Sequence, residues 1–139
     1  MWKLILALLI FSAHLNLTGI VPLLPGDPSP PWWVGGRLLW PFAIETNTLI
    51  PQGDLLNTLT PILSVSSAIC FILAAAALLR WVVPEKWFRT LIVIAAILSI
   101  VLQVIWFTIW AVLPLLLDLI LLWAVFGRQI TVVGLRTKE

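Results

Sequence analysis

One acidic side chain, Asp118, stands inside the apolar stretch AVLPLLLDLILLWAVF, which runs from residue 111 to residue 126. A carboxyl group among apolar side chains must be hydrogen-bonded, paired with a charge or neutral. The groups in the other apolar stretches that can be placed at a comparable depth are one imidazole, His14, and two side-chain amides, Asn16 and Gln103. In a membrane, such a set can transfer a proton or can hold helices together by hydrogen bonds.

The composition indicates whether this acid belongs to a soluble protein or to a membrane protein. Of the 139 residues, 62% are hydrophobic and only 10% are charged, and the mean hydropathy is +1.14. A soluble domain has about 25% charged and about 45–50% apolar residues. A soluble core of this size could not enclose so many apolar side chains, and the excess would form aggregating patches. The sequence therefore predicts an integral membrane protein of one domain.

Four apolar stretches predict membrane-spanning helices, each of which needs about 20 residues and at least about 17. They are residues 2–24, 59–79, 90–107 and 110–126. The last two come from one continuous run, which as a single helix would be about 55 Å long, well beyond a hydrocarbon core of about 30 Å. The chain must therefore turn around the sequence WFTIW. The predicted fold class is all-α, an integral membrane four-helix transmembrane bundle.

The distribution of Lys and Arg predicts the orientation of this bundle. If the N-terminus is cytoplasmic, only one of the eight basic residues, Arg37, lies outside. The short tail 127–139 then lies in the cytoplasm as well. We expect a multi-pass protein of the cell inner (plasma) membrane with both termini cytoplasmic.

The tryptophans lie near the predicted helix ends, where an indole is favoured because it combines an apolar body with one N–H donor. In the simplest interpretation they form an aromatic belt at the two membrane surfaces. The predicted interface anchors are Trp32, Trp33, Trp40, Trp81, Trp87, Trp106 and Trp110.

Residues 25–58 form the predicted outer loop, which is rich in Pro and Gly but contains the apolar sequence WWVGGRLLWPFAI. Proline prevents regular hydrogen bonding and glycine favours turns, so extended segments and turns are expected. A loop of this length is uncommon unless it has a role. Three interpretations stay open: a re-entrant cap on the bundle, a docking surface for a partner, and a pocket for a lipid or quinone headgroup.

The predicted helices bring Asp118 and its candidate partners to a comparable depth. Asp118 and His14 each lie about eight residues, or roughly 12 Å, from the outer ends of their helices, and Asn16 lies half a turn further out. Gln103 lies on the antiparallel helix before Asp118, so it can face the acid. The cluster is interpreted as hydrogen bonding between helices, worth about 1 kcal/mol or less. Alternatively, Asp118 pairs with a partner protein, or His14 and Asp118 form a proton-handling or quinol site.

Small residues four positions apart predict close packing of the helix backbones. Two such pairs are Ser64 with Ala68 and Ala95 with Ser99. Pro114, one turn before Asp118, removes a backbone donor, so a kink or an irregular first turn is expected there.

The motifs of common enzymes are absent from the sequence, which has no glycine-rich phosphate loop, no HExxH and no His or Cys set at metal-ligand spacing. The single cysteine, Cys70, excludes an intrachain disulfide and a CxxC pair. The basic residues form no stripe that would bind nucleic acid. We therefore expect a protein that is not an enzyme and has no cofactor, although a bound lipid or quinone stays open.

The order of the segments resembles that of small four-helix bacterial membrane proteins of the DoxX-like kind. The resemblance rests on a first helix ending in an outer loop, an Ala-rich second helix, a short basic loop with Trp, and the hairpin AAILSIVLQVIW…LPLLLDLILLW. It is a likeness of hydropathy over most of the chain. Members of that group are often associated with quinone-linked or redox membrane complexes, but this chain lacks the cysteine pair of thiol chemistry.

These observations predict an accessory or structural subunit of a larger membrane complex, for example a respiratory or photosynthetic electron-transfer complex. Its partners would be membrane lipids and other membrane-protein subunits. The alternative is a small proton-coupled transporter or quinone-binding membrane protein that uses Asp118 and His14. Replacing Asp118 with Asn distinguishes them, because a scaffold should still assemble whereas a proton-coupled site should lose its pH-dependent activity.

Overall fold

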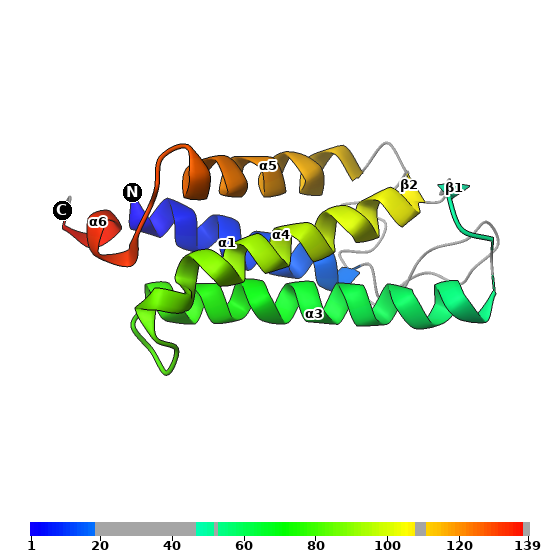
Figure 1. Cartoon of the computed structure of the whole chain (residues 1–139), viewed down its shortest axis with the longest axis horizontal. Coiled ribbons are helices and arrows are strands. Elements are labelled where there is room, and N and C mark those ends of the chain that lie inside the picture. The colour runs from blue at the N-terminus through cyan, green and yellow to red at the C-terminus, as the bar shows by residue number, and fades with distance from the viewer. Residues whose placement is uncertain (19–46, 52, 108–110, 138–139) are drawn as a thin grey trace.

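A computed structural model describes residues 1–18, 47–51, 53–107 and 111–137 of the chain, and their regular secondary structure is helical apart from one pair of very short strands (Figure 1). The long helices are α1 (Trp2–Thr18), α3 (Asp54–Leu78), α4 (Phe88–Ile105) and α5 (Val112–Phe126). The short elements are β1 (Asn47–Thr48), η2 (Glu85–Trp87), β2 (Trp106–Phe107) and α6 (Val132–Arg136). The predicted all-α class is confirmed.

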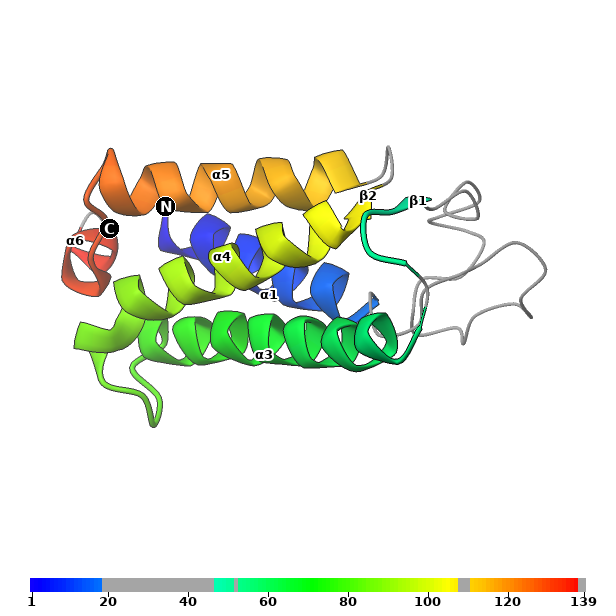
Figure 2. The ribbon, with the colours of Figure 1, turned by 45° about the vertical axis from the view of Figure 1, so that its right-hand side comes forward.

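The four long helices pack side by side as one bundle (Figure 2). α3 packs against α1 and α4, α5 packs against α4, and α1 also contacts α5, which closes the bundle. The N-terminus, the connection between α3 and α4, and α6 lie at one end, which we call the inner end (Figure 1). The β1–β2 pair lies at the other end, which we call the outer end.

The helix boundaries differ from the predicted ones mainly at the outer end. α1 ends at Thr18, and the predicted continuation through residues 19–24 lies outside the described residues. α3 begins at Asp54 instead of residue 59, because an acidic residue in a first turn is favourable and because Leu56 of the added turn is buried in the bundle.

The turn between α4 and α5 contains a strand that the sequence did not predict. β2 pairs antiparallel with β1, so that Thr48 lies opposite Trp106. The backbone N–H of Leu49 also donates to the carbonyl of Ile105 at 3.0 Å. This pairing satisfies backbone groups where α4 ends.

Small residues line the buried faces of α3 and α4. Ser64, Ala68, Ala95 and Ser99, the residues of the two predicted pairs, have no exposed surface. Large apolar side chains fill the core between them, and residues of α6 join this core at the inner end. The small residues of both predicted pairs are therefore buried inside the bundle, and the close approach of the helix backbones stays a prediction.

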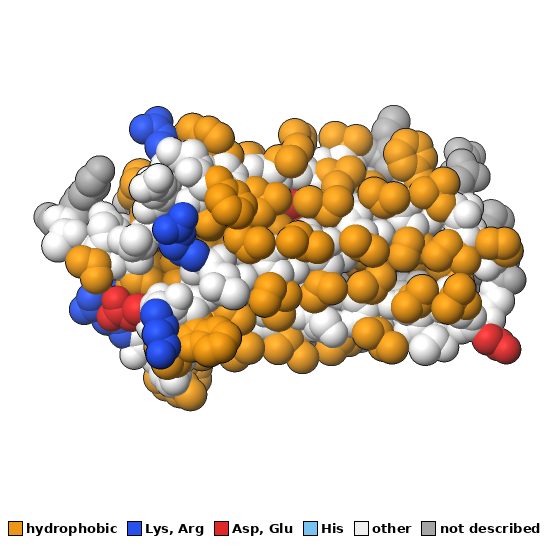
Figure 3. Space-filling view, viewed as in Figure 1, with side chains coloured by type: hydrophobic (Ala, Val, Ile, Leu, Met, Phe, Trp, Pro, Cys, Tyr) orange, Lys and Arg blue, Asp and Glu red, His pale blue; other side chains and the backbone are white. Residues whose placement is uncertain are grey.

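The outer surface of the bundle is apolar between its two ends. In Figure 3, hydrophobic side chains cover the middle of the visible face, and the Lys and Arg side chains gather at the inner end. By length and composition, two helical segments could cross a membrane: α3, and Glu85–Ile105, which combines η2 with α4. α1 and α5 are shorter apolar helices of 17 and 15 residues.

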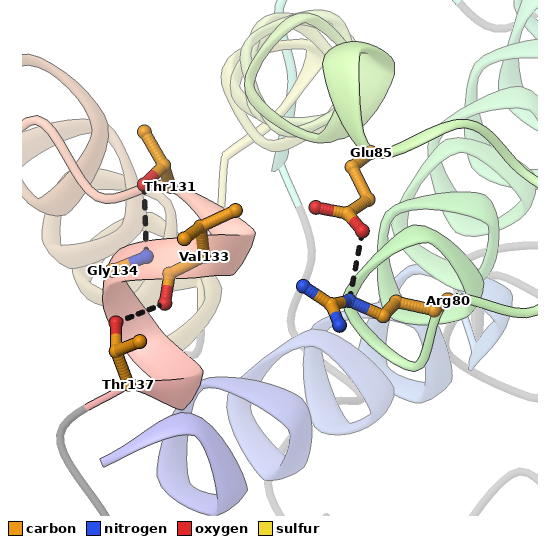
Figure 4. Close-up of polar contacts among 6 residues, drawn as sticks. All are labelled: Arg80, Glu85, Thr131, Val133, Gly134 and Thr137. Atoms are coloured by element: carbon orange, nitrogen blue, oxygen red, sulfur yellow. Dashed lines mark hydrogen bonds and ion pairs between the residues drawn. The ribbon is translucent and has the colours of Figure 1, made fainter.

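Polar contacts stabilise the connecting segments at the inner end (Figure 4). In the loop after α3, Arg80 pairs with Glu85 at 2.8 Å, and both side chains are partly exposed. At the start of α6, the Thr131 hydroxyl accepts a hydrogen bond of 3.1 Å from the backbone N–H of Gly134. Such a cap satisfies a donor that the helix itself leaves free.

Candidate functional site

Asp118 lies on α5 in the interior of the bundle, with no exposed surface. Neither carboxyl oxygen has a hydrogen-bond partner among the described residues. The predicted disturbance at Pro114 has little effect on the helix, because this proline falls in the first turn of α5. Backbone N–H groups there have no partner within the helix, so proline is tolerated. The helix therefore continues past Pro114, and the Asp118 side chain on it lies in the interior of the bundle.

A polar side chain close to Asp118 comes from α4. The Ser99 hydroxyl approaches the carboxyl group, but the contact falls short of hydrogen-bond geometry and Ser99 Oγ has no partner. Ser99 lies six residues before the end of α4 at Ile105. Asp118 lies six residues after the start of α5 at Val112. Since the two helices form an antiparallel hairpin, Ser99 and Asp118 lie at the same level.

A second contact gives the register between α3 and α4. The Ser67 hydroxyl donates to the backbone carbonyl of Ala95 at 2.9 Å, and both residues are buried. One helical turn outward from this contact lie Ser64 on α3 and Ser99 on α4. These two serines therefore lie at one level as well.

Helix α1 joins this level through Asn16. The Ser64 hydroxyl donates to the backbone carbonyl of Asn16. The Asn16 amide nitrogen donates to the carbonyl of Ser12 at 2.9 Å, while its amide oxygen, Oδ1, has no partner among the described residues. Each long helix thus contributes one fully buried polar residue to one level, and we call this set the polar layer: Asn16, Ser64, Ser99 and Asp118.

Gln103 does not join the polar layer, and the expected hydrogen bond between Gln103 and Asp118 is absent. The physical reason is the register of the hairpin, since Gln103 lies one turn outward from Ser99, level with Pro114. Its side chain is only partly buried. Counting residues from helix ends predicted a comparable depth for Gln103 and Asp118, but the difference of one turn removes the contact.

His14 also makes no hydrogen bond with Asp118. It precedes Asn16 by two residues, which rotates its side chain by about 200° around the helix axis. Asn16 is therefore buried, whereas His14 is only partly buried. Of the three partners predicted for the acid, only Asn16 belongs to the polar layer.

Sequence reasoning missed the serines as functional residues. Ser64 and Ser99 were noted only for their small size, and Ser12 and Ser67 were not considered. All four are buried. The signal that could have found them is the recurrence of serines at helical spacing on the face that also carries small residues.

The predicted interface anchors divide into three groups. Trp81 and Trp87 lie at the inner end with 70% and 50% of their surface exposed. Trp106 lies at the outer end but is only 9% exposed, and its indole N–H donates to the Thr60 hydroxyl at 2.8 Å. The others lie outside the described residues: Trp32, Trp33, Trp40 and Trp110. Most of the outer loop 25–58 also lies outside them, so its three interpretations stay predictions.

Comparison with known proteins gives no relative: no family model matches the chain, and neither a curated protein nor a solved structure is significantly similar to it. The resemblance to DoxX-like proteins therefore stays a prediction. In the described part of the chain, no group of three or more His, Cys, Asp or Glu residues could hold a metal ion.

Proposed function

We propose that this protein crosses the bacterial inner membrane four times and acts as a non-catalytic accessory subunit of a larger membrane-protein complex. The observation that carries the proposal is the apolar outer surface, to which every long helix contributes exposed large hydrophobic side chains. Examples are Ile10 on α1, Ile69 on α3, Ile97 on α4 and Leu119 on α5. Such a surface is suited to contact with lipid tails and with apolar faces of neighbouring subunits.

The lengths of the helices are compatible with four crossings. α3, with 25 residues, is about 37 Å long, and α5, with 15 residues, is about 22 Å long. A helix shorter than the hydrocarbon core of about 30 Å can be accommodated by local thinning of the bilayer and by flanking side chains that reach the interface. α5 is followed by such a side chain, Arg128.

The charges favour an orientation with both ends in the cytoplasm. The basic residues of the described part lie at the inner end: Lys3, Arg80, Lys86, Arg89, Arg128 and Arg136 (Figure 3). Asp54, an exposed acid, begins α3 at the outer end. An excess of Lys and Arg near the membrane marks the cytoplasmic side.

Labelling of single cysteines tests this topology. In a Cys70→Ala background, Asp54→Cys and Lys86→Cys place one exposed thiol at each end of the bundle. A membrane-impermeant maleimide added to spheroplasts should label the cysteine at position 54 directly. The cysteine at position 86 should react only after the membrane is permeabilised. The reverse pattern, or equal labelling of both, would contradict the proposed topology.

Purification in a mild detergent tests the role as a subunit. We expect other membrane-protein subunits to co-purify in a fixed ratio with a tagged copy of this chain. A monomer or a simple homodimer as the only species would contradict the accessory role. The topology is tested separately by the labelling experiment.

One observation favours a second candidate, a small proton-coupled transporter or quinone-binding protein. An acid that only joins helices should be hydrogen-bonded, whereas Asp118 is buried and has no partner among the described residues. Ionisable residues inside a membrane commonly mark pathways of ions or protons. Asp118→Asn should leave assembly intact if the protein is a scaffold, and should abolish pH-dependent transport or quinone binding if the acid takes part.

A further inference from the structure

We propose that the polar layer binds one sodium ion, with the carboxyl group of Asp118 as its charged ligand. The inference rests on the proposed spanning bundle but not on its role as a subunit, and it needs no contribution from His14.

Five of the six buried side-chain atoms without a partner among the described residues are oxygens. In the polar layer they are Asn16 Oδ1, Ser99 Oγ and both oxygens of Asp118, and Ser12 Oγ lies one turn inward on α1. The other such side-chain atom of the described residues, Arg136 Nε, belongs to α6 at the inner end. A set made only of carboxylate, amide and hydroxyl oxygens suits a hard cation, since softer metals prefer imidazole and thiolate ligands.

Two of the donors in the layer are already used, and the unpaired Ser99 hydroxyl can donate to only one of the remaining oxygens. The Ser64 hydroxyl donates to the carbonyl of Asn16, and the Asn16 amide donates to the carbonyl of Ser12. One turn inward, the Ser67 hydroxyl donates to the carbonyl of Ala95. These hydrogen bonds use donors of α1 and α3 and leave acceptor oxygens of the layer without a partner. One cation can bind several such oxygens at once.

The charge of the layer selects a monovalent ion. Asp118 is its only ionisable residue, and the Lys and Arg residues of the described part lie at the inner end, away from this level. An unpaired carboxylate is expensive inside a membrane, and a divalent ion would leave one uncompensated positive charge there. One sodium ion makes the site neutral.

Thermal unfolding of the purified full-length protein in detergent tests the site. The melting temperature should rise with NaCl concentration at constant ionic strength, because an ion that binds only the folded state stabilises it. Choline chloride should give no rise. Binding of ²²Na⁺ should saturate at one ion per chain.

Two variants and one control connect this response with the polar layer. Asp118→Asn keeps the shape of the side chain and should abolish the sodium response. Ser99→Ala removes one neutral ligand and should weaken sodium binding by about tenfold. Asp54→Asn removes an exposed acid at the outer end and should leave the response unchanged.

Three results would overturn the proposal. One is the same melting temperature in NaCl and in choline chloride. Another is a sodium response that persists in Asp118→Asn. The third is a melting temperature that follows pH but not sodium, which would assign a proton to the layer instead. None of these results affects the labelling pattern or the co-purification that tests the proposed function.

Discussion

The guanidinium group of Arg136 lies over the indole ring of Trp2, 5.1 Å from the ring centre. Lys3 approaches the same ring at 5.8 Å. The contact joins α6 to the first turn of α1 at the inner end, where Val132 and Leu135 are buried in the core. α6 is therefore part of the packed bundle and not a free tail.

Replacing Trp2 with Leu should lower the free energy of unfolding by about 1–2 kcal/mol, because it removes two cation–π contacts and part of the packing under α6. Thermal unfolding in detergent measures the loss, and trypsin should cleave faster after Arg136. The matched control is Trp123→Leu, since Trp123 is 58% exposed and carries one such contact, with Arg128 at 5.0 Å. An equal loss in both variants would contradict a special role of Trp2.

The hydrogen bond between Trp106 and Thr60 ties α3 to the end of α4 at the outer end. Thr60→Val keeps the shape of the side chain but leaves a buried indole N–H without a partner, which should cost about 1–2 kcal/mol. Equilibrium unfolding measures the cost. Thr58→Val is the control, because its hydroxyl bonds to the Asp54 carbonyl on an exposed face. That variant should change the stability by less than about 0.5 kcal/mol.

Arg89 at the start of α4 donates a hydrogen bond of 2.9 Å to the carbonyl of Val125, near the end of α5. A cation is favourable there because carbonyl groups in the last turn have no helical partner. Arg89→Met should therefore cost about 1 kcal/mol in the free energy of unfolding. Arg80→Met breaks only the exposed pair with Glu85 and should cost less. A larger effect at Arg80 would show that the loop, and not the cap on α5, limits stability.

The sequence was sufficient to predict the four long helices. Charged or Pro-rich loops separate the first three apolar runs, and the run that contains the last two is too long for a single spanning helix. The sequence did not predict the pairing of β1 with β2, because two-residue strands have no periodic pattern and depend on residues far apart in the chain, such as Thr48 and Trp106. The start of α3 was placed too late, because the burial of Leu56 is a tertiary effect.

The candidate site was predicted only in part. Asp118 and Asn16 are conspicuous because they are polar residues in apolar helices, and both are buried. Gln103 has the same property but lies one turn away, since depth alone does not give the register between two helices. Ser99 is level with Asp118, but its side chain did not identify it as a candidate. A serine in an apolar helix can be explained by close helix packing alone, because it is small.

The stability of Asp118 variants should show whether the acid is kept for folding or for binding. In sodium-free buffer, Asp118→Leu should be at least as stable as the parent and up to about 2 kcal/mol more stable, because it removes two buried oxygens without partners. The larger side chain offsets part of this gain through tighter packing. Equilibrium unfolding in choline chloride measures the difference, with Leu117→Ala as a control that should lower stability because Leu117 is a buried apolar residue. A loss of stability in Asp118→Leu comparable to that of Leu117→Ala would mean that the carboxyl group contributes to folding without an ion.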